Sequence, residues 1–356
     1  MKLRKSLLYF AGMTRKGAEI FLSESELLAR LSVSEQKLLK RLEHYPVLIS
    51  RYFSRQIDWR NPEDPLRKQV IPTRAELSQK GFLDFCGERK FMVNRFLIHR
   101  YPDRAVVLGT NQCFGHCRFC FRKRFWKEPS WVIDEDGIKV VCNYLRKKPE
   151  VQELIISGGD PLRMDNLWLE EIIGRAGLLK QILWIRLASR ALSFFPERID
   201  EGLIKILKRA KKQIWFISHF NHPQELQKET KSRIKRLREA GIVILNQTVL
   251  LKGINDRVKI LIELFSGLCE LGVKPYYLFQ CDPVLGGADF AVNLGKAVEI
   301  MKQCSRYSGL MIPRFALEVP NYGKLWLGPG FQLRKSGKNY HLVSPAGKVY
   351  SYPVSG

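Results

Sequence analysis

Short apolar runs recur through the middle of the chain, and stretches with helical periodicity separate them. The runs begin at residues 105, 154, 182, 214, 242 and 276 and are rich in β-branched and aromatic residues, as buried strands are. From the second run onward, successive starts are 28, 32, 28 and 34 residues apart. The clearest helical stretch ends before Gly272, a residue suited to the left-handed conformation that closes a helix, and its apolar face comprises Val258, Leu261, Leu264, Phe265 and Leu268. The pattern therefore predicts alternating strands and helices.

A strand–helix unit that repeats about every 30 residues is typical of parallel strands joined by right-handed crossovers. Six units fit between residues 104 and 307, which is too few for a complete eight-stranded barrel. We therefore predict an α/β fold built on a partial (β/α)6 barrel, with a doubly wound sheet as the alternative. The expected division is a helical N-terminal region (1–95), the barrel (96–310) and a C-terminal segment with a basic tail (311–356).

Polar or glycine-rich residues follow each predicted strand, where the loops at the carboxyl ends of parallel strands meet on one rim. The first of these loops leads into three cysteines, and the second contains two adjacent glycines and an aspartate. The polar stretches are residues 109–112, 157–161, 189–190, 219–222, 246–247 and 280–282. We therefore expect one functional site at this rim.

The charge of the chain is strongly positive, since 60 Lys and Arg stand against 35 Asp and Glu in 356 residues, a formal net charge of +25. The basic residues are spread along the sequence, so we interpret them as a solvated surface and expect no nucleic-acid partner. A hydrophobic content of 45% excludes extensive disorder. No apolar run reaches the ~18 to 20 residues that cross a bilayer, and the run Leu7–Phe10 lacks the length and the cleavage site of a signal peptide. We therefore expect a cytoplasmic protein without a membrane partner.

Three of the eight cysteines, Cys113, Cys117 and Cys120, lie within eight residues, whereas the other five are scattered. A disulfide framework would distribute the cysteines in pairs, so the cluster indicates a metal or cofactor site. Three thiolates at this spacing can hold three irons of a [4Fe–4S] cubane and leave the fourth iron open for a small ligand. Structural zinc, the alternative, requires a fourth ligand from elsewhere in the chain.

The Cys-x3-Cys-x2-Cys motif resembles that of the radical S-adenosylmethionine (SAM) superfamily, whose fold is a partial β/α barrel. The resemblance implies that the [4Fe–4S] cluster binds SAM at its open iron and that the pair supplies the radical that starts the reaction. It also implies a set of SAM-binding residues after the strands, in which the glycine-rich loop approaches the amino group of SAM. That set comprises Ser157, Gly158, Gly159, Asp160, His219 and Gln247.

Longer stretches resemble the lysine 2,3-aminomutase family within this superfamily, over most of residues 60–325 and in matching order. The family includes free-lysine mutases and the enzyme that makes (R)-β-lysine to modify elongation factor P, and this chain resembles the second branch more closely. Its members move an amino group between adjacent carbons with pyridoxal 5′-phosphate (PLP) as well as SAM. The matching stretches are NPEDPLRKQVIPT (61–73), RYPDRAVVL (100–108), SGGDPL (157–162), HFNHPQE (219–225), NQTVLLKGIND (246–256) and KPYYLFQCD (274–282).

The resemblance implies a PLP site. Lys324, after a turn near the C-terminus, matches the lysine that forms the Schiff base with PLP. Arg100 and Arg104 match the arginines that bind the PLP phosphate, a dianion suited to two forked guanidinium groups.

The resemblance also implies a substrate, L-lysine, held at both ends. Arg122 matches the residue that pairs with the substrate carboxylate, and Asp282 and Glu318 match the two acids that pair with the distal ammonium. The implied reaction is an isomerisation that shifts the 2-amino group of L-lysine to C3 to give β-lysine. It requires a reductant such as flavodoxin or ferredoxin, and the sequence is compatible with an oligomer.

Two departures from the family pattern shape the remaining expectations. Free-lysine mutases carry a zinc site, but its barrel cysteine is Arg257 here and no cysteine follows Cys304, so we expect no zinc, as in the elongation-factor branch. The turn before Lys324 is one residue shorter and keeps only Gly323 of the family's glycines. Two alternatives therefore stay open: a radical SAM enzyme that modifies RNA, and an iron–sulfur protein whose catalysis has lapsed.

Overall fold

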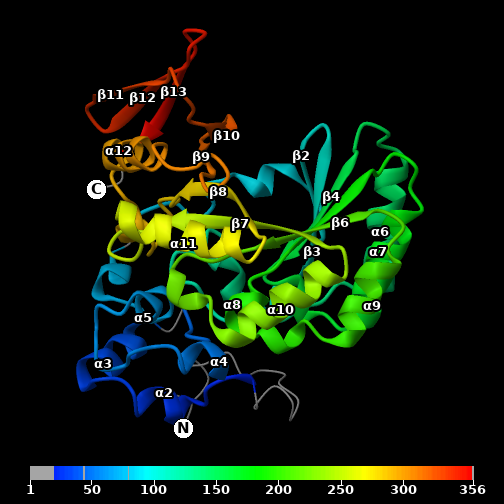
Figure 1. The fold of residues 1–356 in the computed structure, drawn as a ribbon, viewed down its shortest axis with the longest axis horizontal. Helices are drawn as coiled ribbons and strands as arrows, with labels where there is room; N and C mark the ends of the chain where they lie inside the picture. The colour runs from blue at the N-terminus through cyan, green and yellow to red at the C-terminus, as the bar shows by residue number, and fades with distance from the viewer. Residues whose placement is uncertain (1–19, 43–44, 79, 355–356) are drawn as a thin grey trace.

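A ten-stranded sheet forms the centre of the protein, and helices surround it (Figure 1). The computed structural model describes residues 20–42, 45–78 and 80–354, so the N-terminal apolar run at residues 7–10 lies outside the described part of the chain. The strands of this sheet follow one another in sequence order. They are β1 (Met92–Asn94), β2 (Leu97–Tyr101), β3 (Arg104–Thr110), β4 (Glu153–Gly158), β5 (Trp184–Ala188), β6 (Gln213–Ser218), β7 (Val243–Leu250), β8 (Lys274–Gln280), β9 (Arg314–Val319) and β10 (Gly323–Trp326).

The strands β3 to β9 pair in parallel, whereas β1, β2 and β10 add antiparallel edges. Strands β3 to β8 correspond to the six predicted apolar runs and confirm the partial (β/α)6 barrel. A doubly wound sheet would reverse its strand order at a switch point, and the described strands show no reversal. Strand β9 continues the parallel sheet beyond residue 310, where the sequence analysis places the start of the C-terminal segment.

Amphipathic helices connect the parallel strands and pack their apolar faces on the sheet. The predicted helix near residue 260 is α11, which buries Leu261, Leu264, Phe265 and Leu268. It ends before Gly272, whose φ of +69° confirms the left-handed closure. The helices of this region are α6 (Glu135–Arg146), α7 (Asn166–Gly177), α8 (Ala191–Phe194), α9 (Glu201–Arg209), α10 (Lys228–Glu239), α11 (Val258–Glu270) and α12 (Leu294–Cys304), with 3-10 turns η3 (Lys123–Lys127), η4 (Pro161–Arg163), η5 (Pro196–Arg198), η6 (Pro223–Glu225) and η7 (Ala288–Phe290).

Short helices of the N-terminal region lie at the lower left of Figure 1 and pack against the cysteine-containing loop. The amide of His116 donates to the Leu48 carbonyl (2.9 Å), and the amide of Arg118 donates to the Gln69 carbonyl (2.8 Å). The N-terminal region therefore supports the predicted metal site from one side. Its elements are α2 (Glu24–Leu28), α3 (Val33–Arg41), α4 (Arg51–Ser54), α5 (Pro65–Val70), η1 (Arg74–Leu77) and η2 (Glu88–Phe91).

A separate three-stranded sheet follows β10 and lies at the top of Figure 1, on the other side of the barrel from α2–α5. It consists of β11 (Gln332–Ser336), β12 (Asn339–Val343) and β13 (Val349–Pro353), joined as antiparallel neighbours. The ring of Tyr352 on β13 is fully buried and meets the ring of Phe85 edge-on at 6.0 Å. The C-terminal strands thus cover the chain segment that leads to η2.

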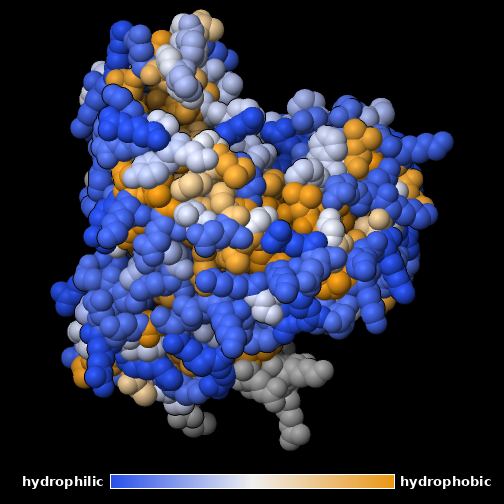
Figure 2. All heavy atoms as spheres, viewed as in Figure 1, coloured by the Kyte–Doolittle hydropathy of each residue, from blue (hydrophilic) through white to orange (hydrophobic). Residues whose placement is uncertain are grey.

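Hydrophilic residues dominate the face shown in Figure 2. On α10 the exposed positions include Lys228, Lys231, Lys235 and Arg238, whereas Ile234 and Leu237 are buried. This arrangement fits the interpretation of the charge as a solvated surface. None of the described helices combines the length and the apolar character that crossing a lipid bilayer requires.

Candidate active site

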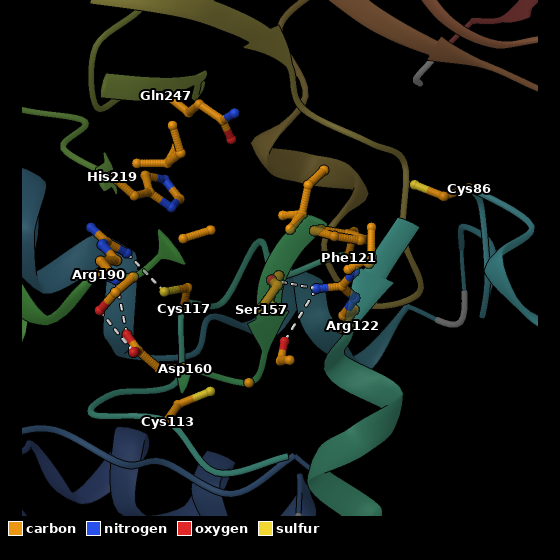
Figure 3. Close-up of a pocket in the computed structure, with 18 of the residues that line it drawn as sticks. Cys86, Cys113, Cys117, Phe121, Arg122, Ser157, Asp160, Arg190, His219 and Gln247 are labelled. Atoms are coloured by element: carbon orange, nitrogen blue, oxygen red, sulfur yellow. Dashed lines mark hydrogen bonds between the residues drawn. The ribbon is translucent and has the colours of Figure 1, made fainter. Parts of the chain in front are cut away.

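One cavity of about 400 Å³ lies among the carboxyl ends of the parallel strands. Every predicted site residue lines it. These residues are Arg100, Arg104, Cys113, Cys117, Cys120, Arg122, Ser157, Gly158, Gly159, Asp160, His219, Gln247, Asp282, Glu318 and Lys324. The sheet topology brings the loops after successive parallel strands to one rim, where Figure 3 shows several of these residues, and the strands β2, β3, β9 and β10 add Arg100, Arg104, Glu318 and Lys324.

The three clustered cysteines lie in the loop after β3, and the two polar residues between them, His116 and Arg118, are bonded away from the cavity. His116 bonds through Nδ1 to the Pro46 carbonyl (2.8 Å), and its ring stacks on Trp126 at 4.3 Å. Burial lowers the pKa of His116 to about 3, so this ring is neutral. Arg118 is fully buried and donates to the Glu76 carboxylate at 2.7 Å. The loop is thus held by its non-cysteine residues, which leaves the thiols to the cavity.

The donor set fits an iron–sulfur cluster. Among the described residues, no three His, Cys, Asp or Glu side chains are placed to hold a single metal ion. In a cubane each thiolate binds its own iron, and three thiols that line one cavity match the three protein-bound irons of a cluster with one open iron. Burial raises the pKa of all three thiols, that of Cys120 to about 11, so metal binding has to displace their protons.

The glycine-rich loop after β4 lies directly against the backbone of the cysteine loop. The amide of Gly159 donates to the Thr110 carbonyl at 2.6 Å. A Cβ atom on Gly158 would come within 2.3 Å of that carbonyl oxygen, and one on Gly159 within 2.3 Å of the Gln112 carbonyl oxygen. Gly158 also has a φ of +133°, which side chains rarely tolerate. Glycine is therefore required at both positions.

Asp160 braces this loop through hydrogen bonds to both of its carboxylate oxygens. Its Oδ1 accepts the Leu162 amide (3.0 Å) and the Ser189 hydroxyl (2.8 Å), and its Oδ2 accepts the Arg190 amide (2.9 Å). Asp160 lines the cavity, but its carboxylate joins the loops after β4 and β5 (Figure 3). We therefore expect Asp160 to act by shaping the glycine-rich loop.

Lys324 lies on β10, directly opposite Glu318 on β9, so both side chains lie on the same face of the hairpin. Its Nζ lies 4.6 Å from the ring centre of Tyr277 and 4.9 Å from that of Phe279. Burial lowers the pKa of Lys324 to about 8, although Glu318 opposes the shift. In the turn, Gly323 has a φ of +108°, and a Cβ there would come within 2.7 Å of the Tyr101 hydroxyl. The shortened turn therefore still directs Lys324 into the cavity.

Two arginines at this end of the cavity come from the β2–β3 hairpin. Arg100 donates through Nη1 to the Cys86 carbonyl (2.9 Å) and lies 3.3 Å from the Glu318 carboxylate. Arg104 donates to Asp103 (2.7 Å), and its guanidinium carbon lies 3.8 Å from the ring centre of Tyr101. A primary amine with two neighbouring guanidinium groups matches the aldehyde and the dianionic phosphate of PLP. The residues present therefore fit this cofactor.

Two buried acids lie near each other in the cavity. The Cys86 thiol lies 3.6 Å from Asp282 Oδ2. Burial, and then the charge of Glu318, raises the pKa of Asp282 to about 8, and burial also raises the pKa of Glu318. A ligand cation here would relieve the repulsion between the two carboxylates. The acid pair therefore suits a positively charged group.

Arg122 already has a carboxylate partner in the protein. Its Nη2 lies 2.6 Å from Glu88 Oε1, and its Nη1 donates to the Ser157 hydroxyl and the Gly158 carbonyl, both at 3.2 Å. Arg124 also donates to Glu88 (2.6 Å). Burial alone would raise the pKa of Glu88, but Arg122 and Arg124 hold it at about 2. Arg122 therefore remains cationic and tethered beside the glycine-rich loop.

Further polar side chains line the cavity and are absent from the predicted set, among them Cys86, Glu88, Arg186 and Arg190. The sequence signalled Arg190 only as a polar residue after a predicted strand. Cys86 and Glu88 lie in the N-terminal region, where no periodic pattern connects them to the barrel. Their place in the site comes from tertiary packing alone.

The lowered pKa of Lys324 predicts that aldehydes label this residue at a lower pH than an ordinary lysine. At pH 7 an amine with a pKa of about 8 is ~10% neutral, against less than ~0.1% for an ordinary lysine. When the cofactor-free protein is treated with PLP and then borohydride, we expect labelling of Lys324 to reach half its maximal rate near pH 8. Peptide mass spectrometry measures it, with exposed Lys302 as the internal comparison. A rate that still rises steeply above pH 9 would contradict the prediction.

Comparison with known proteins identifies residues 107–265 as a match to the model of the radical SAM superfamily. An L-lysine 2,3-aminomutase from Fusobacterium nucleatum is 34% identical over 337 residues, which cover 93% of this chain and 79% of the relative. An L-lysine 2,3-aminomutase from Clostridium subterminale is 33% identical over 327 residues, which cover 90% of this chain and 78% of the relative. The similarity to both relatives thus extends well beyond residues 107–265.

Among solved structures, a radical SAM methyltransferase from Sphaerobacter thermophilus superposes on 62% of this chain and 68% of its own, with a TM-score of 0.47 and 15% identity. This similarity is too remote to inform the arrangement of the cavity.

Proposed function

This chain belongs to the lysine 2,3-aminomutase family of radical SAM isomerases, and from that premise we propose that it shifts the 2-amino group of L-lysine to C3 to give β-lysine. The superfamily implies a [4Fe–4S] cluster and SAM, and the family implies PLP. When bound, the cluster with SAM supplies a radical that removes and returns hydrogen, and PLP carries the migrating nitrogen. The observation that carries the proposal is the meeting of cluster cysteines, an activated lysine and a buried acid pair in one cavity.

The cofactors are proposed to occupy two parts of this cavity. Cys113, Cys117 and Cys120 would hold three irons, with SAM against residues 157–160, His219 and Gln247. Lys324 would bind the PLP aldehyde, and Arg100 and Arg104 its phosphate. Arg186 also lines the cavity and adds a third guanidinium group near Lys324. The positive charge of Arg186 helps to lower the pKa of Lys324.

The substrate is proposed to span from Arg122 to the acid pair. Arg122 Nη2 has Glu88 as its partner, and a second N–H on the same nitrogen is available for a substrate carboxylate. Asp282 and Glu318 would pair with the distal ammonium. Because these groups are largely shielded from solvent and line one cavity of the barrel, the protein would position the reacting carbons and limit the access of water to them.

The two other hypotheses fit the site less well. An RNA-modifying enzyme would need neither the acid pair nor an activated lysine beside two arginines, and its RNA affinity would fall steeply with salt. A lapsed enzyme would be free to lose the geometry of the Lys324 turn. Gly323 instead keeps the one backbone conformation and close approach that direct Lys324 into the cavity.

The proposed function is tested by anaerobic reconstitution with iron, sulfide and PLP, followed by SAM, a reductant and isotopically labelled L-lysine. We expect β-lysine, detected by chromatography and mass spectrometry, with a one-electron donor such as flavodoxin or ferredoxin able to replace the chemical reductant. A fully loaded protein that leaves L-lysine unchanged would refute the proposal.

The raised pKa of Asp282 predicts that lysine binding releases a proton. In the empty cavity Asp282 is mostly protonated below pH 8, and a bound ammonium favours its ionised form. The apparent affinity for L-lysine should therefore rise with pH up to about 8 and then level off. Calorimetry in buffers of different ionisation enthalpy measures the released proton.

Asp282→Asn should weaken lysine binding by ~10- to 100-fold, because a hydrogen bond to a charged group contributes about 1.5–3 kcal/mol. The same variant should abolish the proton release. Asp289→Asn, on the adjacent η7, is the matched loss of an acid and should change neither quantity. L-norleucine, which lacks the distal amine, should bind without releasing a proton. Equal proton release in the wild type and Asp282→Asn would contradict this assignment.

A narrower proposal concerns the destination of the product. Arg257 stands where free-lysine mutases carry a zinc-ligating cysteine, which supports an enzyme that works without zinc and supplies β-lysine for elongation factor P. Intact mass measurement of elongation factor P tests it, after incubation with its lysyl-ligating enzyme and the product of this chain. No gain in the modified mass over a control with L-lysine would contradict this role.

A further inference from the structure

Arg190 is a buried cation that directly contacts one of the clustered cysteines. Its Nη1 lies 2.8 Å from the sulfur of Cys117, and only 7% of the residue is exposed (Figure 3). The side chain comes from the loop after β5, whereas Cys117 comes from the loop after β3. The two loops are therefore joined through an N–H···S hydrogen bond inside the cavity.

A network of buried polar groups fixes the guanidinium of Arg190 in this position. Its Nη2 donates to Glu225 Oε2 (3.1 Å) and to the side-chain oxygen of Gln69 in the N-terminal region. Glu225 is fully buried and accepts in addition the amides of Asn221 (3.0 Å) and His222 (3.1 Å). The Arg190 Nε has no hydrogen-bond partner among the described residues, but these contacts hold both terminal nitrogens of the guanidinium in one arrangement.

The same residue is tied to the glycine-rich loop through its backbone. The Arg190 amide donates to Asp160 Oδ2 at 2.9 Å, and Ser189 donates to the other oxygen of that carboxylate. Arg190 therefore connects the loop proposed to bind SAM, the loop proposed to bind the cluster and the N-terminal region. A residue needed only for folding could satisfy Glu225 and Gln69 without reaching the cysteine sulfur.

We propose that Arg190 is a positioning residue that holds Cys117 toward the iron–sulfur cluster and raises the reduction potential of that cluster. One-electron reduction adds negative charge to the cluster, and a donor N–H with a positive charge at a ligating sulfur stabilises the reduced form more than the oxidised form. Glu225 partly offsets this charge, so the pair sets the potential together. The inference rests on the proposed function for the cluster itself, but it assigns a role that the chemistry of lysine does not require.

The test is a potentiometric titration of the reconstituted cluster, followed by electron paramagnetic resonance, without lysine or PLP. For Arg190→Gln we expect the ratio of reduced to oxidised cluster, at the wild-type midpoint, to fall about tenfold, which is ~59 mV for one electron. Arg190→Lys keeps the charge and should recover part of the loss. Glu225→Gln should shift the potential upward, because it removes a negative charge beside Arg190.

Arg198→Gln is the matched control, since Arg198 is also largely buried, donates to the Leu162 carbonyl (2.7 Å) and is not among the cavity-lining residues. For Arg198→Gln, the ratio of reduced to oxidised cluster at the wild-type midpoint potential should stay within threefold of the wild-type ratio. An unchanged midpoint in Arg190→Gln with full iron content would overturn the inference. If Arg190→Gln retains no iron, the inference stands or falls on the upward shift in Glu225→Gln.

The two proposals fail in different ways. A wild-type protein that assembles no paramagnetic cluster refutes the proposed function. If the wild-type cluster assembles but its reduction potential is unchanged in Arg190→Gln and in Glu225→Gln, only the role of Arg190 is refuted.

Discussion

Cys117→Ala is expected to leave the folded protein without a functional iron–sulfur cluster and to reduce β-lysine formation by at least about three orders of magnitude. A cubane with one open iron requires three thiolates, and the clustered cysteines of the cavity provide them. Groups that act as a unit lose nearly all function when one of them is removed. Iron content, the visible absorbance of the cluster and product formation measure the effect. Thermal unfolding followed by circular dichroism shows whether the fold survives.

The matched control for this loss is Cys269→Ala. Cys269 lies on α11, outside the cavity lining, and its sulfur only approaches the Leu310 carbonyl at 3.7 Å. This variant should keep about four irons per chain and near wild-type turnover. Conversion of lysine by Cys117→Ala at the control's rate would exclude radical chemistry at this cluster.

Lys324→Ala is expected to abolish the covalent attachment of PLP and to reduce turnover by a similar factor. The alanine variant removes the only predicted Schiff-base amine, and the low pKa of Lys324 makes this amine reactive near neutral pH. We expect the absorbance band of the attached cofactor to disappear, together with the labelled peptide after borohydride reduction. Lys324→Arg keeps a cation beside Tyr277 and Phe279 but cannot form the bond, so it should fail equally.

Lys302→Ala, on the exposed side of α12, is the comparison for this variant and should retain the band. The two outcomes separate the possible roles of Lys324. A band that persists in Lys324→Ala would mean that another amine holds PLP. A lost band with normal turnover would mean that the reaction does not depend on this attachment.

The central fold could be predicted because its periodicity is local. Each parallel strand is a short apolar run, and each connecting helix repeats its apolar positions every three to four residues, so six strands were identifiable without tertiary information. Parallel topology then places the ends of these strands on one rim, which is why the polar loops after them could be expected in one cavity, whereas Arg100 and Lys324, on the antiparallel strands β2 and β10, were predicted only from the family resemblance. Strand β9 lacked this support, because it begins after an irregular segment that breaks the regular spacing.

The partners of the site residues could not be predicted in the same way. Glu88 neutralises Arg122 from a segment 34 residues earlier, and Gln69 reaches Glu225 across 156 residues. Such contacts depend on how the N-terminal region packs against the barrel, and no spacing in the sequence encodes that packing. The sequence therefore predicted which side chains line the cavity better than which side chains restrain them.

The pairing of Lys324 with Glu318 across the β9–β10 hairpin also limits how this site can change in evolution. An insertion or deletion of one residue in either strand would turn one of the two side chains away from the cavity, because neighbouring residues of a strand face opposite sides. With the roles proposed for Lys324 and Glu318, cofactor attachment and the recognition of a distal charge would therefore be inherited together. Under the proposed roles, a lineage that acquires a new amino-acid preference would exchange the side chain of Glu318 or Asp282, while the length of the hairpin stays constant.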